Sequence, residues 1–181
     1  MAIKTFTTGE VLTASDTNTY LNNGGLVYIK SQTIGSAVAS VNVTSAFSST
    51  YDNYKIVIAG GTSSSNNTLT LKFGTTVTGY YYSLVYATYA TNAVAGACAA
   101  NAAAILYVGS GVTSSTLGVI EIGSPNIATT TQVSAPFFDA TNAGHLSAYV
   151  NNTTQYTDFT LGISAGTITG GTITVYGYRK G

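Results

Sequence analysis

Tyr54-Lys-Ile-Val-Ile58 is the stretch that decides the fold class of this chain. Tyr54, Ile56 and Ile58 stand two residues apart, so in an extended strand they share one face. The same spacing recurs further along the chain, in Leu69, Leu71 and Phe73; Ile120 and Ile122; Phe159, Leu161 and Ile163; and Ile173 and Val175. The pattern predicts half-buried strands, each with one face on a core and the other face polar.

Turn-forming residues separate these runs. They lie in Gly60 to Asn67, Asn151 to Thr154 and Gly166 to Gly171. Gly and Asn tolerate the positive φ that tight hairpins need. No helical period appears between the strands, so a parallel α/β sheet is not expected. We therefore expect a mainly β fold, an antiparallel β-sandwich of jelly-roll type in residues 31–181, preceded by a short arm in residues 1–30.

The arm carries a helix-start signal, Thr13-Ala-Ser-Asp16. Thr13 can accept a hydrogen bond from the backbone N–H of Asp16, whose carboxylate can reach back to the N–H of Thr13. This predicts a small helix from Ala14 to about Leu21, ended by Gly24-Gly25. A helix of barely two turns is marginal in isolation. It should therefore form only when its apolar residues pack against something.

The middle of the chain is rich in tyrosine and then in alanine. Tyr80 to Tyr89 predicts one strand with aromatic side chains on both faces. Ala93 to Ala104 fits two structures. It could be a short helix, because alanine is the best helix former, or a long loop of small residues pressed against a neighbouring subunit. Cys98, within this segment, is expected to be a small buried hydrophobe.

Charged residues are scarce, at 7% of the chain, and six acidic residues balance six basic ones. Nucleic acid and anionic membranes are poor partners for such a chain, because their binding draws on clustered Lys and Arg. A neutral chain has little electrostatic repulsion between copies, so we expect a homo-oligomer.

Cysteine content and apolar runs exclude other classes. Cys98 is the single cysteine, which excludes an internal disulfide and a zinc site built on several thiolates. No cofactor or metal is expected. Ala93 to Val108 is too short to span a membrane, and Met1 to Glu10 has no apolar core typical of a signal peptide. The chain is therefore expected to be made in a cytoplasm.

Three segments carry a resemblance to a known group of proteins. Phe6-Thr-Thr-Gly-Glu-Val-Leu-Thr-Ala-Ser-Asp-Thr-Asn-Thr-Tyr-Leu21 resembles the N-terminal segment of tailed-bacteriophage virion proteins, with its Gly-x-Val-Leu-Thr-Ala-x-Asp-x-Asn-x-Tyr-Leu pattern. Phe47 to Tyr54 and Ile173 to Tyr178 are similar to strands in the β-sandwich bodies of phage fibre, tail and decoration proteins. Together the segments cover about a fifth of the chain.

The resemblance implies a virion structural protein, often a homotrimer, attached through its arm. The shortness of the chain favours a capsid decoration or cement protein that docks on other virion proteins, such as the major capsid protein. The alternative is a short head or tail fibre that binds a host surface glycan. The arm residues expected to dock are Phe6, Val11, Leu12, Tyr20 and Leu21.

Catalytic constellations are weak in this sequence, and we expect a protein that is not an enzyme. His145 and Asp139 could belong to a Ser-His-Asp triad, but no Gly-x-Ser-x-Gly motif is present. A glycan hydrolase, ranked below the other two functions, needs paired carboxylates, and Glu121 is a candidate for one of them.

The tyrosines are the strongest signal of a binding surface. Tyrosine combines a flat apolar ring with a hydrogen-bonding tip, which suits subunit interfaces and sugars alike. An oligomer interface or core position is favoured over glycan contact for Tyr80, Tyr81, Tyr82, Tyr86 and Tyr89.

Overall fold

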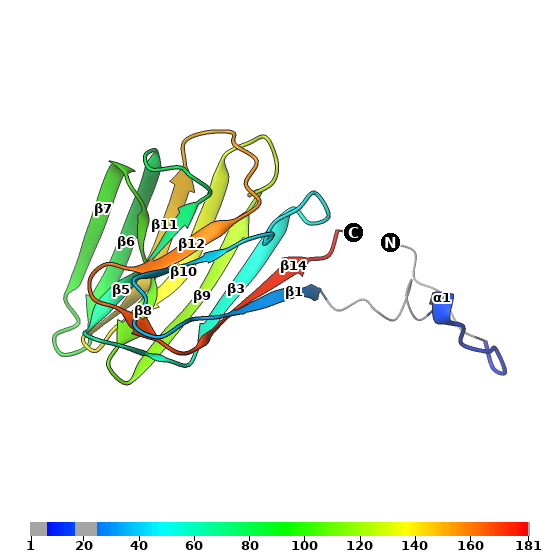
Figure 1. Ribbon diagram of the computed structural model, residues 1–181, viewed down its shortest axis with the longest axis horizontal. Coiled ribbons are helices and arrows are strands. Elements are labelled where there is room, and N and C mark those ends of the chain that lie inside the picture. Colours follow the sequence, from blue (N-terminus) through cyan, green and yellow to red (C-terminus); the bar gives the residue numbers. More distant parts are fainter. Residues whose placement is uncertain (1–6, 17–24, 181) are drawn as a thin grey trace.

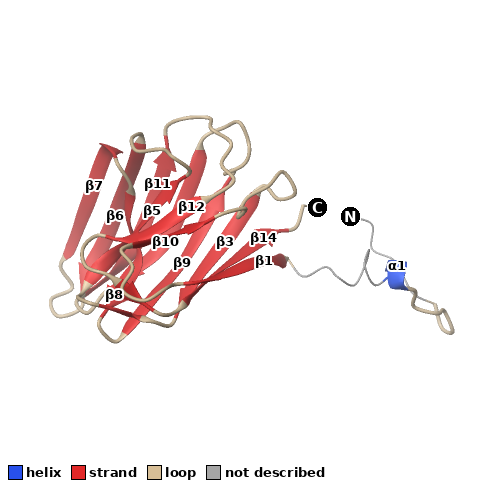
Figure 2. Cartoon of the chain, viewed as in Figure 1, coloured by secondary structure: helices blue, strands red, loops and turns tan. Residues whose placement is uncertain are grey.

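The computed structural model describes residues 7–16 and 25–180, and almost all of its regular structure is β (Figures 1 and 2). A wide sheet contains, in spatial order, β1 (Leu26–Thr33), β14 (Thr172–Tyr178), β3 (Asn53–Ala59), β9 (Ser115–Gly123), β10 (Thr131–Phe138), β11 (Asn142–Val150), β6 (Tyr80–Thr88) and β7 (Val94–Ala102). Every pairing in it is antiparallel.

A narrower antiparallel sheet lies across one face of the wide sheet (Figure 1). Its order is β2 (Ser40–Val43), β12 (Phe159–Ile163), β5 (Asn67–Phe73) and β8 (Ile105–Val112). The β8–β9 hairpin joins the two sheets, with Ser110 paired to Leu117. The predicted mainly β, antiparallel sandwich is confirmed.

The core lies between the two sheets and is built by the predicted alternation. Tyr54, Ile56 and Ile58 of β3 are buried, as are Leu71 of β5 and Phe159 of β12. Residues between them face outward or are only half-buried. Burial of such apolar side chains, at about 1.5–3 kcal/mol each, is the main force that holds the sheets together.

Two glycine pairs allow a close crossing beside the core. Gly60-Gly61 precedes β4 (Thr62–Ser63), and Gly170-Gly171 follows β13 (Ile168–Thr169), which pairs with β4. All four glycines have positive φ. A Cβ on Gly61 would collide with the backbone of Gly170, and one on Gly171 with the backbone of Gly60. Only glycine fits this crossing.

The alanine-rich segment is a strand, so both predictions for Ala93 to Ala104 are wrong. Residues 94–102 form β7, the outer strand of the wide sheet, with Ala97 opposite Leu84 and Cys98 opposite Ser83 of β6. The helix preference of alanine is only a few tenths of a kcal/mol per residue over most others, and pairing with β6 outweighs it. Cys98 is exposed, which corrects its expected burial, because it points away from the narrow sheet.

The helix-start signal in the arm is confirmed. The N–H of Asp16 donates to Thr13 Oγ1 at 3.1 Å, and the N–H of Thr13 donates to Asp16 Oδ2 at 3.1 Å. Helix α1 spans Ala14–Asp16. Its predicted continuation to Leu21 lies outside the described residues. Figure 1 places this turn outside the sandwich, while β1 already begins at Leu26.

Candidate functional site

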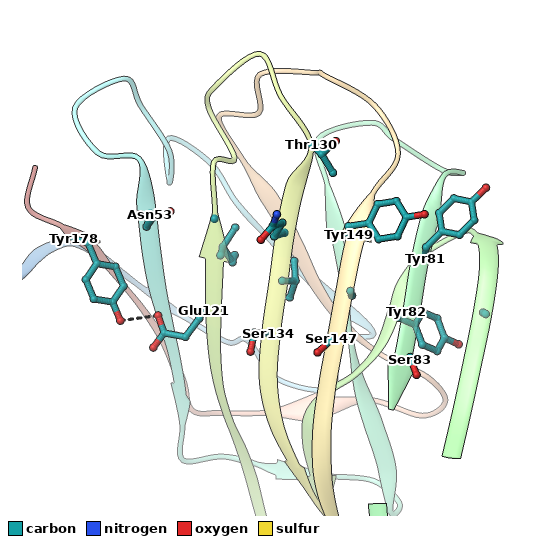
Figure 3. A pocket seen from close by; sticks show the side chains of 16 residues that line it. Asn53, Tyr81, Tyr82, Ser83, Glu121, Thr130, Ser134, Ser147, Tyr149 and Tyr178 are labelled. Carbon is teal, nitrogen blue, oxygen red and sulfur yellow. Dashed lines mark hydrogen bonds between the residues drawn. The ribbon is translucent and has the colours of Figure 1, made fainter. Parts of the chain in front are cut away.

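The outer face of the wide sheet, opposite the narrow sheet, is hollowed into a groove of about 1040 Å³ (Figure 3). The groove crosses the strands from the end of β14 to β6. Hydroxyls, amides and tyrosine rings dominate its lining, and Glu121 is the one formally charged side chain among the described residues that line it.

Small hydroxyl side chains form the floor. Ser134 on β10, Ser147 on β11 and Ser83 on β6 lie directly opposite one another in the register of the three strands. Each serine is next in sequence to a buried core residue, Val133, Leu146 or Leu84, and therefore points to the opposite, outer face of the sheet. Because these outward side chains are short, the floor lies below the larger side chains at its two ends.

Two stacked tyrosines stand at one end. Tyr81 on β6 and Tyr149 on β11 are cross-strand partners, with ring centroids 5.0 Å apart and planes 10° from parallel. Tyr149 is 41% exposed. The stack holds both rings in place and leaves a flat aromatic surface beside the serine floor (Figure 3).

A polar cluster stands at the other end. The Tyr178 hydroxyl donates to Glu121 Oε2 at 2.6 Å, and Lys55 Nζ lies 3.1 Å from Glu121 Oε1. The hydrogen bond to Glu121, with burial and the carboxylate charge, raises the pKa of Tyr178 to about 12. A hydrogen bond from Tyr178 and an ion pair with Lys55 therefore hold the Glu121 carboxylate in place on the outer face of the sheet.

The predicted tyrosines are divided between the two faces of β6. Tyr81 points into the groove, whereas Tyr80 is buried; its hydroxyl accepts from the N–H of Phe73 at 2.7 Å, and burial raises its pKa to about 12. Tyr82 and Tyr86 pack against the core. Tyr89 is exposed beyond the end of β6. Alternation along β6 therefore places Tyr80, Tyr82 and Tyr86 on the face opposite Tyr81, although Tyr82 also borders the groove.

The residues considered for a triad are not brought together. His145 Nε2 lies 3.3 Å from Ser134 Oγ. Asp139 instead closes the β10–β11 turn, where Oδ1 accepts the N–H groups of Thr141 and Asn142, each at 2.7 Å. Burial raises the pKa of Asp139, but these hydrogen bonds outweigh it and lower the pKa overall. Asp139 therefore holds a turn rather than orienting His145.

Among the described residues that line the groove, Glu121 has no second carboxylate beside it. Asp52 is paired with Lys180 at 2.7 Å, and Glu121 is engaged by Tyr178 and Lys55. In the part of the chain that the structure describes, no three His, Cys, Asp or Glu side chains gather as metal ligands would. Nor does any described helix have the length and apolar character needed to cross a membrane.

The predicted arm residues are exposed where they are described. Val11 is 79% exposed and Leu12 50% exposed, next to the capped turn. Phe6, Tyr20 and Leu21 lie outside the described residues.

Most of the groove could not be recognised in the sequence. Tyr149 and Tyr178 were separate single tyrosines, and the serines gave no signal until register placed them in one row. Comparisons with protein-family models, with curated proteins and with solved structures found no match.

Proposed function

We propose that this chain is a non-enzymatic structural protein of a phage particle, a capsid decoration or cement protein that docks through its N-terminal arm. The observation that carries the proposal is the exposure of Val11 and Leu12 beside a capped turn. Apolar side chains held on an ordered turn outside the core are suited to burial against another protein.

The energy available from such docking is moderate for one arm. Full burial of an apolar side chain contributes about 1.5–3 kcal/mol, and Val11 and Leu12, already partly covered, would each contribute less than this. Several copies acting together would add their contributions through effective concentration. A homotrimer therefore supports firm attachment better than a single chain.

The surface of the body supports self-association. Val85, Val94 and Phe138 are large apolar residues exposed on the outer face, and the register places Phe138, Ala143, Ala87 and Val94 in one row across four strands. The chain carries no net charge to keep copies apart. We propose that a homotrimer covers this row. Light scattering that finds a monomer at micromolar concentration would exclude it.

The test of docking is incorporation into particles. Val11→Ser combined with Leu12→Ser should abolish or strongly reduce the copies found in purified particles, measured by mass spectrometry against the major capsid protein. Thr7→Ser, an exposed change in the same segment, is the matched control. Unchanged thermal unfolding would show that the body stays folded. Incorporation of the double variant at the wild-type level would contradict docking by the arm.

A second role, as a short fibre that contacts host glycan, is favoured by the groove. Copy number separates the two roles. Hundreds of copies per particle would support decoration, and a handful would support a fibre. Absence from particles would contradict both.

A further inference from the structure

We infer that the groove between Tyr149 and Tyr178 binds a neutral oligosaccharide that lies across the strands. This inference rests on the second, glycan-contacting role and is independent of docking by the arm. The two ends of the groove are the Tyr81–Tyr149 stack and the Glu121–Tyr178 cluster. The floor of the groove is the row of Ser134, Ser147 and Ser83.

The stacked end supplies the apolar contact that a sugar ring needs. One face of a pyranose ring is made largely of C–H groups, which pack against a flat aromatic ring. Tyr149 offers such a ring, and its contact with Tyr81 restricts its rotation. A ring that is already ordered loses less conformational entropy on binding.

The floor matches sugar hydroxyls in chemistry and spacing. A serine hydroxyl both donates and accepts hydrogen bonds, as a sugar hydroxyl does. Neighbouring strands lie about 4.8 Å apart, so the row of serines repeats at close to the length of one pyranose unit. The five interstrand steps from β14 to β6 span about 24 Å, enough for several sugar units.

The charged end selects against anionic ligands. The Glu121 carboxylate can accept hydrogen bonds from two adjacent sugar hydroxyls. Lys55, the cation beside it, is already paired with Glu121. An acidic sugar, a phosphate or a nucleic acid would therefore bring a negative charge beside the Glu121 carboxylate, with no spare cation among the described residues that line the groove, whereas a neutral glycan brings no such charge.

An extended peptide fits less well. Peptides that join a sheet pair with the backbone of an edge strand. The groove instead lies over the face of central strands, whose backbone groups are already paired in β9, β10 and β11.

The first experiment is an array of neutral, sialylated and sulfated oligosaccharides probed with the purified full-length chain. Retention on neutral oligosaccharides is expected. The best neutral ligand is then titrated calorimetrically. Retention confined to acidic glycans, or none on any neutral one, would overturn the inference.

Variants then locate the binding. Tyr149→Ala should raise Kd about tenfold or more, and Ser147→Phe should abolish binding by filling the floor. Their matched controls are Tyr28→Ala, a 60% exposed tyrosine on β1 outside the groove, and Ser31→Phe, which enlarges an exposed serine of β1 outside the groove. Both controls should bind as the wild type does.

If Tyr149→Ala and Ser147→Phe bound the sugar with the affinity of the wild type, the sugar would bind elsewhere, and the inference would be overturned. So would a concentration-dependent dimer that protects Tyr149 from chemical modification, because the groove would then be occupied by a second copy. The titration uses no particles. Loss of glycan binding and loss of incorporation are therefore separate results, and each contradicts only its own proposal.

Discussion

The two faces of β6 and β11 differ completely, although their residues alternate along the same strands. The inner face carries Tyr80, Leu84 and Leu146, all fully buried, while the outer face carries Tyr81, Ser83 and Ser147 around an open groove. Neighbouring residues of one type, Tyr80 and Tyr81, therefore have different roles. Strand register, rather than residue type, decides which tyrosine stabilises the fold and which can contact a ligand.

The largest difference between the faces should appear in large-to-small substitutions on β11. Leu146→Ala removes a fully buried side chain and should lower the free energy of unfolding by about 2–5 kcal/mol, because it leaves a cavity. Ser147→Ala, on the outer face one residue away, should stay within about 0.5 kcal/mol of the wild type. Denaturant unfolding measures both. Equal losses would show that the outer face is also packed, as in a tight oligomer.

Tyr80 and Tyr81 offer a finer comparison. Tyr80→Phe leaves the buried N–H of Phe73 without the hydroxyl that it contacts at 2.7 Å, and should cost about 1–3 kcal/mol. Tyr81→Phe keeps the ring stack on Tyr149 and should leave the free energy of unfolding unchanged. A loss in Tyr81→Phe as large as that in Tyr80→Phe would contradict the assignment of the two faces.

A third comparison needs no substitution, because alkaline pH removes the proton of the buried Tyr80 hydroxyl. The pKa of Tyr80 is raised from 10.0 to about 12, so the folded state favours the neutral phenol. Its contribution is fully present below pH 10, where the unfolded chain is also neutral, and is lost as the pH rises through 12. Stability should therefore fall over this range.

Thermal unfolding between pH 9 and 12 measures that loss. Tyr178 has a pKa raised to about 12 as well, so the slope should be reduced in Tyr80→Phe and further reduced when Tyr178→Phe is added. An unchanged slope in the double variant would assign the loss to other groups.

The smallest effect is expected at the ion pair of the outer face. Lys55→Met breaks the 3.1 Å contact with Glu121, but both side chains are about one-third exposed, so the change in unfolding free energy should be below about 1 kcal/mol. This change in unfolding free energy should be smaller still in high salt, which screens the ion pair. A cost of several kcal/mol that persists in high salt would mean that another molecule buries this end of the groove.

The strands with strong alternation were predictable, and those with small residues were not. Tyr54 to Ile58 and Phe159 to Ile163 show their buried faces in sequence, because large apolar side chains recur at every second position. β7 contains mainly Ala and Gly, and in β11 small residues separate the buried Leu146 and Val150 from a longer apolar run, so pairing rather than side-chain pattern defines both strands. The Thr13–Asp16 box was predictable because its partners are only three residues apart.

The groove could not be predicted from the sequence for a related reason. Ser134 and Ser147 face each other across the β10–β11 hairpin, but Ser83 comes from β6, much earlier in the chain, and only the register of β11 with β6 aligns it with them. Clustering in sequence suggested that the tyrosines of β6 act together. In the structure, Tyr81 instead stacks on Tyr149, a residue from another strand.

The pairing of β1 with β14 has a mechanical consequence. The chain enters the sandwich at the edge of the wide sheet, where the ladder joins Leu26 to Tyr178 at one end and Thr33 to Thr172 at the other. A pull on the arm along β1 loads all of these hydrogen bonds in shear, so they must break together. A pull at a right angle would open them one at a time from Leu26. A force applied between the arm and the body along β1 should therefore be resisted more strongly than one at a right angle to the strand, so the rupture force measured by pulling should depend on direction.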